Sequence, residues 1–130
     1  VRPFRAMKLS VIIVAYDMDR ELPRSLASLT RDYQLDCEDV EYEVLVVDNG
    51  SPVPLPQSAI TSFGPEFVYH SLENPPPSPS YALHYGVQHA KGEIICLMVD
   101  GAHMVTPGIF SKALAASRAF PNAIGITRYF

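Results

Sequence analysis

Runs of consecutive apolar residues mark the strands that this chain is expected to form. The three strongest runs occupy residues 9–16 (LSVIIVAY), 42–47 (YEVLVV) and 94–99 (IICLMV). Short apolar runs bounded by turn residues are typical of strands that are buried on both faces, as in a parallel sheet. Two weaker patterns, at 66–70 and 122–130, predict one short strand and one strand at the end of the chain.

Helical spacing appears between the first two predicted strands. Residues 20–31 carry three leucines on one helical face, at positions 22, 26 and 29. Because Pro23 is tolerated only in a first helical turn, this helix should begin near Glu21. An acidic connector at 32–41 then leads to the second strand.

Two more helices are predicted in the second half of the chain. Residues 80–90 have a helical pattern, and Gly92 should cap that helix just past its end. Thr106 should cap a third helix, with Pro107 in the first helical position. The apolar face of this third helix would use Ile109, Phe110, Ala113, Leu114 and Phe120.

The alternation of strands and helices predicts an α/β fold, with a Rossmann-like, mostly parallel sheet flanked by helices. We expect one domain over residues 1–130, in which residues 1–6 would be an extension before Met7. The segment 73–80 (ENPPPSPS) must be an extended loop, and its composition alone favours a rigid linker.

Composition narrows the class of protein. A hydrophobic content of 48% and a charged content of 18% are typical of a globular domain. The net charge of −4 and the lack of a Lys/Arg cluster argue against a nucleic-acid partner. No apolar run has the length of a membrane span, residues 1–10 lack the apolar core of a signal peptide, and two cysteines make no secreted framework. We therefore expect a cytoplasmic protein, which could work at the membrane surface.

Polar residues follow three of the predicted strands at the point where each strand ends. Tyr16 and Asp17 follow the first strand, Asp48 follows the second, and Asp100 follows the strand at 94–99. Ligands of open α/β sheets bind outside the carboxyl ends of the strands. Carboxylates there suit hydrogen bonds to ribose hydroxyls or to a uracil-type base edge, and can hold a divalent cation against a diphosphate. One such aspartate is more often a loop cap, but three together favour a nucleotide site.

The common glycine-rich phosphate loops are missing from the turn after the first strand. That turn has the sequence AYDMDREL, which is neither a dinucleotide fingerprint nor a Walker loop. A nucleotidyltransferase of the sugar-nucleotide pyrophosphorylase kind would also need a glycine-rich, basic loop at this place. The sequence therefore favours a different nucleotide-binding fold.

Three segments together resemble the GT-A fold glycosyltransferases of family 2. Residues 9–29 (LSVIIVAYDMDRELPRSLASL) resemble the opening strand and helix of that family. Residues 44–51 (VLVVDNGS) resemble its second strand, which ends in Val-Asp-Asp-Gly-Ser. Residues 73–108 (ENPPPSPSYALHYGVQHAKGEIICLMVDGAHMVTPG) resemble the segment that carries its Asp-x-Asp motif, and the closing Pro-Gly fits that register.

The resemblance implies that the chain binds a nucleotide-diphosphate sugar, with a UDP-linked sugar as the expected donor. Ala15 and Tyr16 would lie beside the base, and Asp48 would bond the base edge, with Asn49 next to it. Asp100 would contact the ribose and the unit formed by the metal and the diphosphate.

The chain departs from the family pattern at several of these positions. Ala102 stands at the second aspartate of the Asp-x-Asp motif and cannot ligate a metal. His103 could replace it and hold a divalent metal together with Asp100, and an imidazole suits Mn²⁺ better than Mg²⁺. A loop histidine without a metal is the alternative. Asn49 replaces an acid but keeps hydrogen bonding, and His84 would either reach the diphosphate or lie on a helix surface.

Two hypotheses about function follow. The first is an inverting glycosyltransferase, or its donor-binding half, that acts on a sugar or lipid-linked acceptor. The catalytic domains of the family are longer than this chain, so we expect the acceptor half and the general base outside residues 1–130 and name no catalytic residue. The second is a non-catalytic module of the same fold that binds a nucleotide sugar or serves as a scaffold, as Ala102 suggests.

Overall fold

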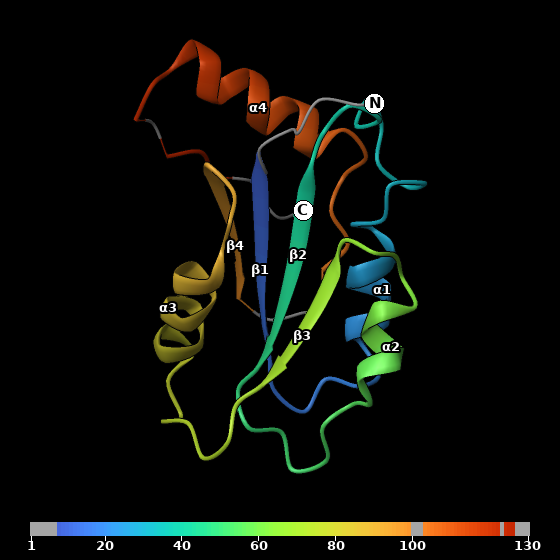
Figure 1. Cartoon of the computed structure of the whole chain (residues 1–130), viewed down its shortest axis with the longest axis vertical. Helices are drawn as coiled ribbons and strands as arrows, with labels where there is room; N and C mark the ends of the chain where they lie inside the picture. The colour runs from blue at the N-terminus through green and yellow to red at the C-terminus, as the bar shows by residue number, and fades with distance from the viewer. Residues whose placement is uncertain (1–7, 100–102, 123, 127–130) are drawn as a thin grey trace, which may run out of the picture.

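The computed structural model describes residues 8–99, 103–122 and 124–126. Within these ranges the chain forms a four-stranded sheet in the order β3-β2-β1-β4, in which every neighbouring pair is parallel (Figure 1). The strands are β1 (Leu9–Ala15), β2 (Tyr42–Asp48), β3 (Phe67–Ser71) and β4 (Ile94–Val99). The predicted α/β fold with a parallel sheet is therefore confirmed.

Helices pack against both faces of this sheet. They are α1 (Leu22–Ala27), α2 (Gln57–Thr61), α3 (Pro79–His89) and α4 (Ile109–Ala119). Apolar residues of α1, α2 and α4 share one core with every second residue of β1 and β2. On the other face, the described residues place α3 against the alternate residues of the same two strands (Figure 1). The alternation of side chains along each strand thus supplies both cores.

Glycine allows two very close approaches on the α3 side of the sheet. A Cβ added to Gly86 of α3 would lie 2.5 Å from Ile12 Cγ2 of β1. A Cβ added to Gly92 would lie 2.6 Å from the backbone nitrogen of Ser10. Gly92 was predicted to cap α3, and that prediction is wrong, because the helix ends with Ala90 as its cap residue. Gly92 is instead the place where the chain passes against β1.

The buried carboxylate of Glu43 joins β1, β2 and the segment after α3 through hydrogen bonds. Glu43 of β2 accepts hydrogen bonds from the Ser10 hydroxyl at 2.6 Å and from the Lys91 backbone N–H at 2.7 Å. The Gly92 N–H in turn donates to Ser10 Oγ at 2.8 Å. A buried charged oxygen is stable only when such donors satisfy it. The network therefore fixes how the segment after α3 enters β4.

Four other predictions need correction. The run at 94–99 is not buried on both faces, because β4 is an edge strand of the described sheet and Leu97 is 54% exposed. The helix predicted over 20–31 is helical only as α1, and turns follow it. Residues 124–126 are not a strand, and the rest of the predicted last strand lies outside the described residues.

The fourth correction concerns the start and the end of α4. Gly108, in the left-handed region with φ of 91°, is the N-cap residue, so Thr106 does not cap this helix. The sequence Thr106-Pro107-Gly108 forms a turn first, closed by the Ile109 N–H on the Thr106 carbonyl. Phe110 is buried against the sheet as predicted, whereas Phe120 is 67% exposed.

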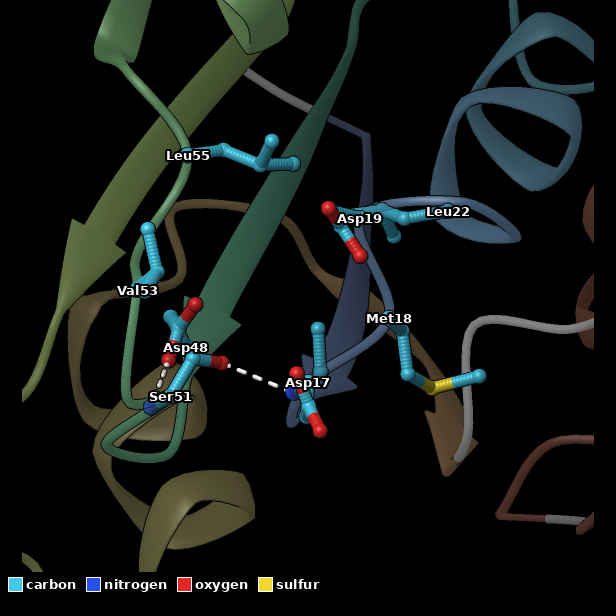
Figure 2. Close-up of a pocket in the computed structure, with 9 residues that line it drawn as sticks. Asp17, Met18, Asp19, Leu22, Asp48, Ser51, Val53 and Leu55 are labelled. Atoms are coloured by element: carbon cyan, nitrogen blue, oxygen red, sulfur yellow. Dashed lines mark hydrogen bonds between the residues drawn. The ribbon is translucent and has the colours of Figure 1, made fainter.

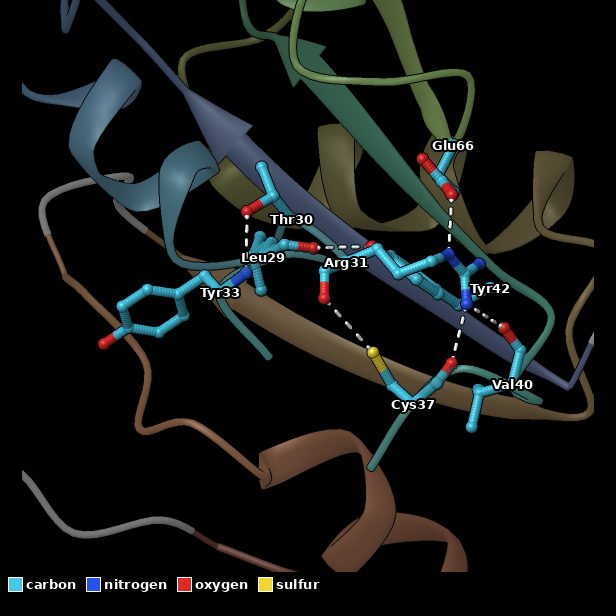
Figure 3. A network of polar contacts seen from close by, with 8 residues as sticks. All are labelled: Leu29, Thr30, Arg31, Tyr33, Cys37, Val40, Tyr42 and Glu66. Carbon is cyan, nitrogen blue, oxygen red and sulfur yellow. Dashed lines mark hydrogen bonds and ion pairs between the residues drawn. The ribbon is translucent and has the colours of Figure 1, made fainter. Parts of the chain in front are cut away.

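Arg31 holds the acidic connector between α1 and β2 (Figure 3). Its Nη1 donates to the carbonyl oxygens of Cys37 and Val40 at 2.6 and 3.0 Å, and its Nε donates to Glu66 at 3.0 Å. The guanidinium lies over the ring of Tyr42, 4.8 Å from the ring centroid. One planar cation with several donors can satisfy all of these acceptors together. Cys37 is buried by this arrangement, and both cysteines are free thiols.

None of the helices in the described part of the chain is both long and apolar enough to cross a bilayer.

Candidate functional site

Two adjoining pockets lie at the carboxyl ends of β1 and β2, and the predicted nucleotide residues divide between them. Ala15 and Asp48 line the smaller pocket, which has a volume of about 280 Å³. Tyr16 and Asn49 line the larger pocket, which has a volume of about 730 Å³. Met18 lines both. We call them the carboxylate pocket and the proline pocket, after the side chains described below.

The division follows from strand alternation. Ala15 and Asp48 are register partners in the parallel β1–β2 pair, so their side chains lie on the same face as α1 and α2. Tyr16 and Asn49 each come one residue later. The Asn49 N–H donates to the Ala15 carbonyl at 2.8 Å and so carries the ladder past the end of β2. Consecutive residues therefore reach opposite sides of the sheet edge.

Asp48 is the most firmly held side chain of the carboxylate pocket (Figure 2). It is 5% exposed, and both of its oxygens accept hydrogen bonds from within the chain. The Ser51 N–H donates to Oδ1 at 2.7 Å, and the Tyr69 hydroxyl donates to Oδ2 at 3.0 Å. Burial, followed by the charge of Asp48, raises the pKa of Tyr69 to about 12, so this hydroxyl stays a donor at neutral pH.

Three carboxylates surround the carboxylate pocket. Asp17 and Asp19 come from the loop after β1, and Asp48 comes from the end of β2 (Figure 2). Asp17 has a φ of 51°, and its N–H donates to Ser51 Oγ at 2.8 Å. Ser51 thus donates its N–H to Asp48 and accepts the Asp17 N–H at its hydroxyl, so it links the end of β2 to the loop after β1. Such a pocket suits ligand groups that donate hydrogen bonds, and it repels a free phosphate.

The proline pocket has a different chemistry. Its walls include the rings of Pro75, Pro77 and Pro79, the side chain of Val14 and the ring of Tyr16, which is 56% exposed. No charged side chain is found among the described residues that line it. The segment 73–80 was interpreted as a rigid linker from its composition, and the structure corrects this, because the segment forms a wall of the pocket.

Gly50 allows the proline-rich loop to lie close to the end of β2. It has a φ of 83°, and a Cβ added there would lie 2.8 Å from Pro75 Cδ. The side-chain amide of Asn49 contacts the same loop, because Nδ2 donates to the carbonyl oxygens of Pro76 and Ser78 at 3.4 and 3.5 Å. The loop is therefore held against β2 by backbone shape and by weak hydrogen bonds together.

Of the two residues predicted to hold a metal, the structure describes one. Asp100 lies outside the described residues, although Val99, directly before it, lines the proline pocket. His103 is described and exposed. His84 is exposed on α3 and lines neither pocket. In the ranges that the structure describes, no three His, Cys, Asp or Glu side chains are grouped so that they could hold a metal ion.

Gln34 anchors the segment that follows the predicted motif. Its Oε1 accepts from the Gly108 N–H at 3.0 Å, and its Nε2 donates to the Ser28 carbonyl at 2.8 Å. The hydroxyl of Ser28 accepts from the Val105 N–H at 3.1 Å. Because Gln34 is 4% exposed, these bonds fix residues 105–108 against the region after α1.

Sequence reasoning missed the partners of Asp48. The spacing from Asp48 to Ser51 was a usable signal, because an aspartate side chain often accepts from a backbone N–H a few residues on. Tyr69 gave no such signal, since its meeting with Asp48 depends on the register of β3 against β2. The role of Asn74, which lines the proline pocket with a φ of 47°, also depends on a loop path that sequence does not specify.

Comparisons with known proteins agree with this architecture. The model of the family described as "Glycosyl transferase family 2" matches residues 10–128. No curated protein sequence matches the chain. Among solved structures, S. aureus TarS matches with a TM-score of 0.74 at 21% identity, over 94% of this chain and 23% of that one.

Two structures of TarS residues 1–349 match in the same way, one of them in complex with UDP. The TM-score is 0.75 for each, the identities are 22% and 21%, and each match covers 94% of this chain. This chain spans 39% and 38% of the lengths of those two chains, so it corresponds to a minor part of them. At these identities the likeness shows a common fold.

Proposed function

The chain belongs to glycosyltransferase family 2, and from this premise we propose that it binds the nucleotide-diphosphate sugar donor of an inverting glycosyl transfer. The donor is a UDP-linked sugar, and the acceptor is a sugar or a lipid-linked molecule. The UDP complex of TarS, a protein of the same fold, supports the choice of nucleotide.

The observation that carries the proposal is the placement of four residues in two adjoining pockets. Ala15, Tyr16, Asp48 and Asn49 come together at the carboxyl ends of parallel strands, with Met18 between the pockets. This edge is where open α/β sheets bind ligands. A pocket rich in carboxylates beside an uncharged pocket suits a ligand with both hydroxyl groups and a planar base.

Each assigned group has a definite task in donor binding. Asp48, held by Ser51 and Tyr69, is fixed before the ligand arrives and can accept a further hydrogen bond from a base or a ribose hydroxyl. Tyr16 offers an exposed ring face on which a base can stack. Ala15 leaves room beside Asp48 for the ligand. A ligand held in this way loses less freedom when it reacts.

Charge on the leaving diphosphate must be neutralised during transfer. A divalent ion, Mn²⁺ or Mg²⁺, would supply that neutralisation, and we propose Asp100 and His103 as the residues that face it. The described residues do not by themselves form a metal site, and Ala102 offers no ligand atom. The contacts assigned to Asp48, Tyr16 and Ala15 in donor binding do not depend on the ion. The base that deprotonates the acceptor is not among the residues assigned.

A second candidate function is a module of the same fold that binds the nucleotide sugar without turning it over. The alanine at position 102, where the family pattern has its second aspartate, favours this alternative. A sugar-nucleotide hydrolysis assay on the full-length gene product separates the two. Metal-dependent turnover would exclude the non-catalytic module.

Isothermal titration with UDP, with and without Mn²⁺, tests the proposal directly. We expect binding, and we expect Asp48→Ala to weaken it. A matched control is Glu73→Ala, which removes an exposed carboxylate that lines neither pocket. No detectable heat at millimolar UDP, with or without the metal, would rule out a donor site in this chain.

A further inference from the structure

Two histidine rings lie close together on the side of the sheet that α3 covers. His70 belongs to β3 and is the register partner of Val47, whose side chain lies in the core beneath α3. His89 is the last residue of α3. The centroids of the two imidazole rings are 5.4 Å apart, and the ring planes are inclined at 52°. Neither histidine lines the carboxylate pocket or the proline pocket, so the donor site proposed above does not use this pair.

Tyr85, one turn before His89 on α3, positions both imidazole rings. Its hydroxyl oxygen lies 3.0 Å from His70 Nδ1, and its backbone carbonyl oxygen lies 2.8 Å from His89 Nδ1. The ring of Tyr85 also stacks on that of His89, with 4.0 Å between the centroids, and meets that of His70 edge-on at 5.4 Å. One residue therefore fixes the placement of both histidines.

These contacts decide which ring nitrogens remain available. A carbonyl oxygen carries no hydrogen, so His89 Nδ1 must be protonated, and the neutral ring has its lone pair on Nε2. The hydroxyl of Tyr85 can either donate or accept, so it allows the same tautomer at His70. No hydrogen bond within the described residues engages Nε2 of either ring. Each histidine can therefore offer one imidazole nitrogen to a ligand.

A first-row transition-metal ion such as Zn²⁺ fits this arrangement. A histidine that binds a metal commonly donates its other ring N–H to a carbonyl or a similar acceptor, as His89 does here. Two imidazoles on one tetrahedral ion, with metal–nitrogen distances of about 2.0–2.1 Å, have ring centroids about 5.2 Å apart. The observed 5.4 Å is close to this spacing. Burial and then the charge of His89 lower the pKa of His70, which favours the neutral ring that a metal requires.

We propose that His70 and His89 form an open site for Zn²⁺ or a similar cation, with Nε2 of each ring as the ligand atom and Tyr85 as the positioning residue. Among the described residues no third His, Cys, Asp or Glu completes a ligand set, so water fills the remaining positions. The ion joins the last turn of α3 to β3. Mg²⁺, which prefers oxygen ligands, binds poorly to such a pair. The site shares no residue with the metal site proposed beside the donor diphosphate.

Zn²⁺ alone, without any nucleotide, tests the site on the full chain. The NMR signals of the imidazole rings are followed while Zn²⁺ is added, and then while Mg²⁺ is added to a separate sample. We expect saturable shifts of the His70 and His89 rings at micromolar Zn²⁺ and none with Mg²⁺. Because binding is read at these two rings, an ion bound near His103 is not mistaken for it. Before Zn²⁺ is added, long-range ¹H–¹⁵N correlations should show His89 as the Nδ1–H tautomer.

Substitutions separate this pair from other histidines. Tyr85→Phe removes the partner of His70 Nδ1 and should weaken Zn²⁺ binding about tenfold. His70→Gln and His89→Gln each remove a ligand and should weaken it by more than that. His84→Gln is the matched control, because it removes an exposed histidine of the same helix, and it should leave the affinity unchanged.

Three results would overturn the proposal. The first is the absence of saturable shifts at the two rings, or shifts only at millimolar Zn²⁺. The second is an affinity that falls as much in His84→Gln as in His89→Gln, which would indicate unspecific binding to surface histidines. The third is an Nε2–H tautomer at His89, because the proposed ligand atom would then carry a proton.

Discussion

The hydroxyl of Tyr69 donates a hydrogen bond to Asp48 Oδ2 at 3.0 Å, from β3 to the end of β2. The bond lies between neighbouring parallel strands whose register sets Val46 opposite Tyr69 and Asp48 opposite Ser71. It is therefore a diagonal contact across the strand pair, made possible by a long side chain. The buried carboxylate of Asp48, at the carboxyl edge of the sheet, is fixed in this way by the protein itself.

Replacement of Tyr69 by Phe should destabilise the fold and change its response to alkali. Loss of a hydrogen bond to a buried carboxylate costs about 1.5 kcal/mol. Because the pKa of Tyr69 is raised to about 12 from 10, its contribution is complete below pH 10 and is lost as the pH rises through 12. Urea unfolding of the wild type and of Tyr69→Phe from pH 8 to pH 12 gives the difference in their free energies of unfolding.

The difference between wild type and Tyr69→Phe is the informative quantity, because burial also raises the pKa of Tyr42 and so adds its own alkaline loss to both proteins. We expect the stability gap between them to close above pH 10. A gap that stays constant to pH 12 would show that the Tyr69 hydroxyl does not titrate beside Asp48.

Arg31 should be difficult to replace, even by another cation. Arg31→Lys keeps the charge but cannot reach the carbonyl oxygens of Cys37 and Val40 and the carboxylate of Glu66 together. We expect a loss of about 2 kcal/mol in the free energy of unfolding, measured in urea. Arg24→Lys, on the exposed face of α1, is the control and should change little. Equal stability of the two variants would contradict the anchoring role.

The glycines near β1 should respond to alanine in a definite order. In Gly92→Ala the new Cβ meets backbone at 2.6 Å, and in Gly86→Ala it meets the Cγ2 methyl group of Ile12 at 2.5 Å, which is a side-chain and not a backbone atom. Overpacking typically costs about 1–3 kcal/mol, and we place Gly92→Ala at the upper end. Gly125→Ala, where a Cβ meets nothing within 4 Å, is the control. Thermal unfolding that ranks Gly86→Ala as the more damaging change would contradict this packing.

His70 should make the fold sensitive to mild acid. Its Nδ1 lies 3.0 Å from the Tyr85 hydroxyl and its ring lies 5.4 Å from that of His89. Burial and then the charge of His89 lower the pKa of His70, while Glu43 opposes them. As the pH falls, His70 is therefore protonated in the unfolded chain before it is protonated in the folded one. The contribution of His70 to the free energy of unfolding is complete above pH 6.5 and falls as the pH drops below it.

NMR titration of the His70 ring checks this account. We expect its pKa to lie below that of an exposed histidine and to rise in His89→Gln, where one nearby cation is removed. A pKa of His70 that does not change in His89→Gln would show that the two rings are not electrostatically coupled.

The sequence predicted the parallel sheet because β1 and β2 are buried on both faces. Their sequences therefore show unbroken runs of apolar residues. The same logic failed for β4, since an apolar run does not distinguish a central strand from an edge strand such as the one holding Leu97. The residues predicted at the end of β2 do line pockets at the edge of the sheet, and their role in nucleotide binding stays a prediction. Their separation into two pockets, with Asp48 in one and Asn49 in the other, required the loop paths that follow.

Local capping rules failed where tertiary contacts decide the backbone. Thr106 and Pro107 have the pattern of a helix start, yet the Gly108 N–H is bound to Gln34 and α4 begins after it. Gln34 lies far away in sequence, in the acidic connector at 32–41, where the sequence predicts neither a helix nor a strand. Such a buried amide cannot be distinguished from a surface one by sequence pattern.

The central claim, that the donor nucleotide binds at the carboxyl edge of β1 and β2, is tested most directly by mapping UDP onto the chain. Backbone amide shifts of the labelled protein are followed during a UDP titration. We expect saturable shifts at Tyr16, Asp48, Asn49 and Asn74, with Lys8 and Glu93, at the amino ends of β1 and β4, unchanged. Shifts confined to other surfaces, or no shifts at millimolar UDP, would contradict it.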